Sequence, residues 1–499
     1  MTSPHDAPSA PARDQFVRGI GPLAATSLVV GSMIGSGIFI VSADISRQVA
    51  GWGPGGLLLV WLLTGLMTLA GALAYAELAA MLPNVGGQYV FLREGLSPAA
   101  GFLYGWTLFT VIQTGTIAAV AVAFAKFLAV LLPSVTPDVF LKLGTLNLPG
   151  GAIELGLSHQ RLVAVVMIAV LTLVNMRGVR LGAAIQTVFT VAKVGALVAL
   201  IVLGLFIFRQ PAISAMNFDT FWGAQAWGLA MLPVVGAAMV GSLFSSDAWN
   251  NVTFAAAEVR EPQKNLPRAL AYGTGLVSLL YVLANVAYLN VLPFGGQPDG
   301  ADAFERGINF ASQDRVGTAA LEAILGPKGA IVMAVAILVS TFGCNNGLIL
   351  AGPRVYYAMA RDRLFFKRAG TLHPAHHTPA FGLLAQAAWA MALCLTGTYG
   401  QLLDYVIFAA LIFYLLTTVS LFRLRRLQPD LPRPVKAFGY PVVPALYILS
   451  IAFLLVVLLV DPDKRKFSAF GLLIVALGIP VYLLWLWLGR REARPAPGA

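Results

Sequence analysis

Charged residues are scarce in this sequence: they make up 11% of its 499 residues, whereas about a quarter of the residues in a typical soluble domain are charged. Cysteine is also scarce, and Cys344 and Cys394 both lie within apolar segments. The low charge excludes a soluble globular domain, and the two cysteines exclude a disulfide framework. Apolar residues are abundant instead, at 58%, with a mean hydropathy of +0.79. The composition therefore predicts an integral membrane protein.

A membrane-spanning helix needs about 20 consecutive, mainly apolar residues, and the chain offers about twelve such segments. The predicted fold class is an all-α membrane protein with the bilayer as its surroundings. We expect the spans near residues 22–46, 56–82, 99–132, 161–176, 181–208, 227–255, 269–293, 317–346, 380–397, 402–422, 440–460 and 467–488.

Lysine and arginine residues concentrate in alternate loops, for example at 260–268, 354–368 and 423–436. Because cytoplasmic loops carry an excess of these residues, we expect both termini to be cytoplasmic and the protein to lie in the plasma (inner) membrane. The net charge of +11 thus predicts no nucleic-acid partner. Residues 1–20 lack a signal-peptide pattern and are expected to form a short disordered tail, and residues 489–499 a second tail.

The first apolar segment contains a sequence that is unsuited to a continuous helix. Residues 31–39 read Gly-Ser-Met-Ile-Gly-Ser-Gly-Ile-Phe, with three glycines and two serines where lipid most requires a complete helix. Unpaired backbone at membrane depth is tolerated only where protein buries it or where it lines a cavity. The segment therefore predicts a broken helix that binds a ligand, as in secondary transporters.

The sixth apolar segment contains a similar sequence. Both segments contain Val-Val-Gly followed by Gly-Ser and a phenylalanine, Phe39 in the first and Phe244 in the sixth. An offset of five spans reverses the orientation, so the second half of the chain would be an inverted repeat of the first. Coincidence between two segments rich in glycine and valine is the alternative.

Polar residues follow Phe244 as Ser245-Ser246-Asp247-Ala248-Trp249-Asn250-Asn251. We expect the helix to end near Phe244 and to restart after Asp247, with Asp247 either capping the restarted helix or attracting a substrate cation or a proton. Phe244 and Trp249 either gate a substrate or simply pack. Free N–H groups at one break suit a carboxylate and free carbonyl groups suit an ammonium, which together match an α-amino acid.

These motifs resemble those of the amino acid–polyamine–organocation superfamily, and most closely its L-type amino acid transporter branch. The resemblance rests on Gly-Ser-Gly-Ile-Phe at 35–39 and extends through nearly the whole chain. Further matching motifs are Tyr-Ala-Glu-Leu at 75–78, Pro-Asn-Val-Gly-Gly-Gln-Tyr at 83–89, Phe-Leu-Tyr-Gly-Trp at 102–106, the loop at 258–269, and residues 340–347 with 354–362.

The resemblance implies two inverted five-helix repeats, at 21–208 and 227–422, and two extra helices at 440–488. It implies sodium-independent transport of amino acids, expected to be neutral, by exchange or proton coupling. A cationic amino acid or polyamine antiporter is the alternative. No cofactor or metal is expected, and no disulfide-linked glycoprotein partner, because neither cysteine lies in an outer loop. The implied substrate site comprises Met33, Ile34, Gly35, Ser36, Gly37, Phe244, Ser245 and Asp247, with Phe244 as an aromatic gate.

Lys193 lies near the centre of the fifth span, where an unpaired ammonium is unfavourable and should find acceptors. By the resemblance it occupies a sodium position and bridges span one to span eight near Ser340 and Thr341. It acts either in coupling or as a structural cation. Lys126 is expected to extend to the membrane interface, and Glu77 to pair with backbone or an arginine at the inner end of its span.

Other classes of protein find less support in the sequence. A metal site at His373, His376 and His377 lacks a completing cysteine or acidic ligand. A membrane enzyme would need a nucleophile–base pair or a metal-ligand set within the spans. A channel would need rings of repeated polar residues. None of these patterns is present, so we expect a transporter and not an enzyme.

Overall fold

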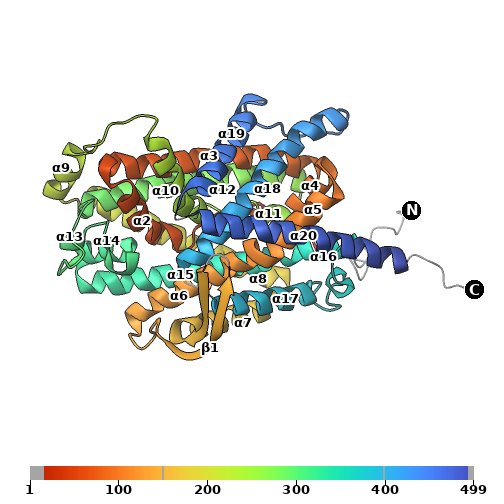
Figure 1. Ribbon diagram of the computed structural model, residues 1–499, viewed down its shortest axis with the longest axis horizontal. Coiled ribbons are helices and arrows are strands. Elements are labelled where there is room, and N and C mark those ends of the chain that lie inside the picture. The colour runs from red at the N-terminus through yellow and green to blue at the C-terminus, as the bar shows by residue number, and fades with distance from the viewer. Residues whose placement is uncertain (1–15, 149–150, 397–398, 463, 493–499) are drawn as a thin grey trace, which may run out of the picture.

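The computed structural model describes residues 16–148, 151–396, 399–462 and 464–492. Helices dominate this part of the chain, and most of them run along the long axis of the molecule (Figure 1). α9 and α13 lie at the left edge of Figure 1, and the end of α20 lies at the right edge. We call the face where α1 begins the N-terminal face, and the opposite face the vestibule face.

The first half of the chain contains the helices of the first five expected spans. They are α1 (Pro22–Met33), η1 (Gly37–Phe39), α2 (Val41–Gln48), η2 (Ala50–Trp52), α3 (Gly53–Met81), α4 (Gln88–Gly95), α5 (Pro98–Thr107), η3 (Leu108–Ile112), α6 (Gln113–Leu131), α7 (His159–Met176), α8 (Val179–Val202), η4 (Leu203–Ile207) and α9 (Pro211–Asp219).

The second half repeats this plan and adds two helices. Its elements are α10 (Met231–Ser245), α11 (Asn251–Phe254), η5 (Ala256–Glu258), α12 (Pro262–Val291), α13 (Ala303–Arg306), η6 (Ser312–Asp314), α14 (Val316–Leu325), α15 (Pro327–Ala351), α16 (Pro353–Arg361), η7 (Lys367–Gly370), α17 (Ala380–Cys394), α18 (Tyr399–Leu427), α19 (Val442–Val460) and α20 (Arg465–Glu492).

Ten helical segments among the described residues are long and apolar enough to cross a membrane, and the shorter apolar helices α10 and α17 complete the twelve expected spans. The fold is that of an all-α, multi-pass membrane protein. The second span of each half, α3 and α12, pack against each other along their length, and so do the third spans, α6 and α15. These symmetric pairs are what an inverted repeat places together.

Two helix boundaries and one loop differ from the sequence-based expectation. The eighth span begins at Pro327 and not near residue 317, because Gly326 adopts a left-handed φ of 67° and separates α14 from α15. The long loop at 133–160 contains an antiparallel hairpin, β1 (Val139–Leu148) and β2 (Gly151–Ser158), which we did not predict. α20 continues to Glu492, so helix occupies the first residues of the expected tail at 489–499.

The expected N-terminal tail is also wrong at its end. Residues 1–15 lie outside the described residues, but residues 16–20 are ordered against the N-terminal face. The Phe16 ring packs edge-on to Tyr357, at 4.9 Å between ring centroids. The Ile20 amide donates to the Glu258 carbonyl at 2.9 Å, and the Arg260 amide donates to the Ile20 carbonyl. Hydrogen bonds to the segment after span six hold this part of the chain.

Candidate substrate site

The first helix is broken at the predicted position. α1 ends at Met33, and the chain forms regular helix again only at Gly37 and Val41. Within the described part of the chain, the amide nitrogens of Ser36 and Gly37 donate no hydrogen bond, and the buried Ser36 hydroxyl has no partner. Unpaired N–H groups at the start of a helix form a site for an anion. The break therefore presents donors suited to a carboxylate.

The sixth span is broken beside the first. α10 ends at Ser245, and the chain becomes helical again at Asn251. The Tyr281 hydroxyl, from α12, lies 2.9 Å from the Met33 carbonyl oxygen and 3.0 Å from that of Ser245. Tyr281 thus connects one carbonyl group from each break, and free carbonyl groups at the breaks are what we expected to suit an ammonium. Tyr281 is not among the site residues that the sequence predicts, although a tyrosine within the seventh apolar span was the available signal.

The two breaks are in direct contact. A Cβ atom built on Gly37 would lie 2.0 Å from the Ser245 hydroxyl oxygen and 2.9 Å from the Ser245 Cα atom. Any side chain at residue 37 would have to displace the backbone of α10. Glycine at this position is therefore what allows the two broken helices to meet.

The expectation that Asp247 caps the restarted helix is wrong. The residue at the N-cap position of α11 is Asn250, whose side-chain amide donates to Gln88 at 2.6 Å. The Asp247 carboxylate instead accepts a short hydrogen bond from the Tyr414 hydroxyl, which comes from α18. Asp247 is 6% exposed, and it forms no ion pair with any residue that the structure describes. It is a buried acid with a neutral partner, which is rare unless a charge is supplied from elsewhere.

Two narrow cavities of about 10 and 20 Å³ flank Asp247 and Tyr414. Each has room for about one water molecule. Gln88, Tyr104 and Asn250 line the first cavity, and Trp249 and Tyr447 line the second. Polar side chains from five different helices or breaks thus gather around one carboxylate.

The two aromatic residues proposed as gates are both buried. Trp249 is 2% exposed and packs edge-on to Tyr75, with ring centroids 4.7 Å apart, and against Tyr414 at 5.3 Å. Phe244 is 6% exposed at the end of α10, next to the break. The surroundings of Trp249 are those of a core residue. Phe244 has the better position for contact with a substrate.

Lys193 bridges the first and eighth spans. Its ammonium donates to the carbonyl oxygens of Gly31 at 2.6 Å, Ile34 at 2.7 Å and Ser340 at 3.1 Å. The Ser340 hydroxyl lies 3.1 Å from the carbonyl oxygens of Ile34 and Gly35. One cation thereby satisfies two carbonyl groups of the first span beside its break, as a bound metal cation would.

The neighbours of Ser340 differ in their roles. The Thr341 hydroxyl bonds to the Ile337 and Leu338 carbonyl oxygens within its own helix. Cys344, one turn further along α15, lies 3.0 Å from the Ser32 carbonyl oxygen, and a Cβ on Gly35 would lie 3.1 Å from its sulfur. Of the two hydroxyl residues expected beside Lys193, only Ser340 is part of this bridge.

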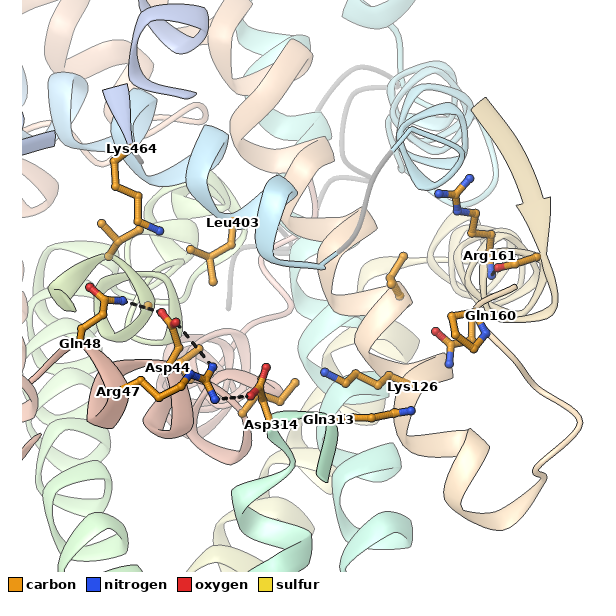
Figure 2. Close-up of a pocket in the computed structure, with 17 residues that line it drawn as sticks. Asp44, Arg47, Gln48, Lys126, Gln160, Arg161, Gln313, Asp314, Leu403 and Lys464 are labelled. Carbon is orange, nitrogen blue, oxygen red and sulfur yellow. Dashed lines mark hydrogen bonds and ion pairs between the residues drawn. The ribbon is translucent and has the colours of Figure 1, made fainter. Parts of the chain in front are cut away.

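A cavity of about 510 Å³ opens on the vestibule face, and Figure 2 shows the residues that line it. Its lining includes Ile40 and Val41 of α2 and Val240 and Gly241 of α10. The Ser245 hydroxyl, which touches Gly37, bonds to the Gly241 carbonyl at 2.8 Å. The lining of the vestibule therefore reaches within one helical turn of the candidate site. Lys126, which we expected to extend to the membrane interface, lines this vestibule.

The N-terminal face is closed by buried polar contacts. The Arg354 guanidinium donates to the Glu258 carboxylate at 2.7 Å, and both side chains are almost fully buried. Burial and then the hydrogen bond to Asp362 raise the pKa of Tyr89, so its hydroxyl remains a donor at neutral pH. Buried polar contacts thus pack the N-terminal side of the site, and the vestibule approaches the site from the opposite face.

Glu77 has the structural role that we predicted. Its carboxylate accepts hydrogen bonds from Arg425 at 2.6 Å and from the Ala437 amide at 2.7 Å. In the histidine-rich loop, the rings of His373 and His376 stack, and His373 Nδ1 accepts from the backbone amides of Ala375 and His376. These contacts give Glu77, His373 and His376 structural roles.

Comparison with known proteins finds a matching family and several relatives. Residues 20–485 match the model of a family described as amino acid permease. The chain is 30% identical to the large neutral amino acids transporter small subunit 2 of Mus musculus, over 94% of this chain and 81% of the mouse protein. It is 30% identical to the serine/threonine exchanger SteT of Bacillus subtilis, over 93% of this chain and 95% of SteT. It is 27% identical to the mouse b(0,+)-type amino acid transporter 1, over 95% and 90% of the two chains.

Proposed function

Because the chain belongs to the amino acid permease family, we propose that it is a secondary transporter of neutral amino acids that works by alternating access, without sodium, and by exchange. We infer further that it lies in the plasma membrane with its N-terminal face toward the cytoplasm. The vestibule then faces outward. This orientation follows from the excess of lysine and arginine in the loops on the N-terminal face.

The observation that carries the proposal is the contact between the two broken helices at Gly37 and Ser245. In our proposal the substrate carboxylate binds the amides of Ser36 and Gly37. The ammonium binds the carbonyl oxygens of Met33, Phe244 and Ser245, once Tyr281 releases the two that it now occupies. An α-amino acid supplies an anion and a cation at the spacing of one carbon atom, which is what such a pair of helix ends can recognise.

Transport without sodium is supported by the three carbonyl contacts of Lys193. Because the ammonium of Lys193 is fixed between spans one and eight, no bound metal cation is needed there. We propose that Lys193 and Ser340 couple the break in α1 to α15 during the transport cycle. Exchange is supported by the relatives, one of which is named a serine/threonine exchanger.

Small substrates are supported by the narrow cavities beside Asp247, which leave little room for a large side chain. We propose side chains of the size of alanine or serine, with Phe244 closing over the substrate and Trp249 supporting it from behind. Cys344 and Cys394 are both buried, so we expect no disulfide-linked partner subunit.

One observation favours a second candidate function, the transport of cationic amino acids. Asp247 is buried without an ion pair among the described residues, and it does not cap a helix. A substrate ammonium or guanidinium beyond the α-carbon would complete this site. One relative is a b(0,+)-type amino acid transporter, and that protein aligns over 95% of this chain.

Counterflow in proteoliposomes tests the proposal. Vesicles loaded with each of the twenty amino acids in turn should accumulate labelled alanine when the internal amino acid is a small neutral one, with sodium absent. Accumulation only against lysine or arginine would favour the second candidate. No counterflow with any of the twenty would contradict amino acid exchange.

A further inference from the structure

The cationic side chains that line the outer vestibule outnumber the carboxylates. Four cations line it, Arg47, Lys126, Arg161 and Lys464, against two carboxylates, Asp44 and Asp314. The low-dielectric walls of a cleft focus such an excess and raise the local concentration of ions of opposite charge. The vestibule is therefore electrostatically suited to an anionic group.

The cations differ in what they contact. Arg47 donates to Asp314 at 2.8 Å and to the Asn309 carbonyl at 2.6 Å, so its charge is compensated. Arg161 donates to the carbonyl oxygens of Gly156 and Leu395. Lys126 is partly buried, and within the described part of the chain its ammonium has neither a hydrogen bond nor an ion pair. Its charge lies near that of Asp314 without an ion-pair contact, so the Lys126 ammonium can take a carboxylate ligand.

Lys126 is also well placed. It projects from α6 into the cavity toward the side where Asp314 and Arg47 lie (Figure 2). Val122, one turn earlier on α6, lines the same cavity, which continues to Gly241 on α10. A ligand at Lys126 would therefore stand on the path to the broken helices. A volume of about 510 Å³ is within the range of small-molecule sites and can hold one amino acid.

From this geometry we propose a second, outer binding site, in which Lys126 binds the α-carboxylate of an incoming amino acid before it reaches Ser36 and Gly37. The α-ammonium faces the carboxylates of Asp44 and Asp314 across the cavity. This inference rests on the proposed transport of amino acids. It adds a recruiting step at a site that is distinct from the central one.

The proposal is tested with succinate, a carboxylate without an α-ammonium, added outside intact cells during uptake of labelled alanine. Succinate should compete in the wild type, and Lys126→Gln should weaken this inhibition about tenfold, as expected for loss of a charge contact. The same variant should raise KM for alanine more than it lowers the maximum rate. Lys126→Arg, which keeps the charge, should restore both properties.

Lys328→Gln is the matched control, because Lys328 is an exposed cation at the start of α15 and does not line the vestibule. It should leave succinate inhibition as in the wild type. Equal inhibition in the wild type, Lys126→Gln and Lys328→Gln would overturn the outer site while leaving transport itself intact. Absence of uptake in the wild type would contradict the proposed function instead.

Discussion

Gly37 lies against Ser245 so closely that a Cβ atom at residue 37 would come within 2.9 Å of the Ser245 Cα atom. The first and sixth spans meet at this pair, and both are broken there. We expect Gly37→Val, and even Gly37→Ala, to abolish uptake, because the added carbon would push the two breaks apart.

Gly195→Ala is the control for this prediction, since a Cβ at Gly195 would have no neighbour within 4 Å. Initial uptake rates are compared at equal amounts of protein that elutes as a single peak in size-exclusion chromatography. Gly195→Ala should transport normally. Normal uptake by Gly37→Ala would remove the contact with Ser245 from the mechanism.

Lys193 should make transport independent of sodium. Replacing external sodium with choline should leave the initial rate of uptake unchanged, because the ammonium already occupies the carbonyl oxygens of Gly31, Ile34 and Ser340. Lys193→Met should lose uptake and melt at a lower temperature, since each buried carbonyl left unpaired costs about 1–3 kcal/mol. A steep dependence of wild-type uptake on sodium would refute this role for Lys193.

Competition experiments on Asp247 should distinguish neutral from cationic substrates. If the transporter takes small neutral amino acids, alanine should compete strongly against labelled alanine and lysine weakly, in the wild type and in Asp247→Asn alike. Strong competition by lysine that disappears in Asp247→Asn would favour the second candidate function. The comparison is made under one set of conditions, because charge contacts are sensitive to salt.

Tyr414→Phe should lower the melting temperature more than Asp247→Asn does. The phenylalanine removes a hydrogen bond to a buried carboxylate, which is worth about 1.5–3 kcal/mol, and leaves the charge with the Ala248 backbone as its donor. Asparagine removes the charge itself. A double variant that is no less stable than Asp247→Asn alone would show that the two residues act as a pair. Fully additive losses in the double variant would argue against a direct interaction.

The buried pair of Arg354 and Glu258 should hold the N-terminal face closed. Removing one partner of a buried ion pair costs about 3–5 kcal/mol, so Glu258→Gln should favour opening on this face. Cys344, which is 2% exposed beside the first break, is a natural reporter of opening. In a Cys394→Ser background, a membrane-permeant maleimide should label Cys344 faster when Glu258 is replaced.

Glu261→Gln provides a control on the same face, because Glu261 pairs with Lys264 at the surface and such exposed pairs contribute little. Its labelling rate should match that of the parent. If Glu258→Gln and Glu261→Gln label at the same rate, the buried pair does not control access from this side.

The broken helices were predictable from sequence because the signal is local. Glycines and serines at 31–37 weaken helix formation in a segment where lipid demands a complete helix, and the structure breaks α1 there. The need of Lys193 for acceptors was predictable for the same kind of reason, since a cation within a span is unfavourable alone. The twelve apolar segments likewise follow from composition and length.

Other features depended on partners that are distant in the chain. The local sequence pattern suggests that Asp247 caps the next helix, but its carboxylate accepts a hydrogen bond from a tyrosine 167 residues away. The sequence predicts that Phe16 and Ile20 belong to a disordered tail. In the structure, Ile20 forms hydrogen bonds with the segment after span six, and Phe16 packs against an aromatic ring of α16. The vestibule combines side chains from both halves of the chain.

There is a physical reason why the sequence predicts some of these features and not others. Hydrophobic segments and helix breaks follow from the properties of neighbouring residues in the sequence, so the sequence by itself determined the class of fold and where the backbone would be free to bind a ligand. Which buried charge meets a hydroxyl, a carbonyl group or nothing depends on how helices pack. Only the tertiary structure could therefore decide that Lys193 has three acceptors, that Asp247 has Tyr414, and that Lys126 lines the vestibule without a hydrogen bond or ion pair among the described residues.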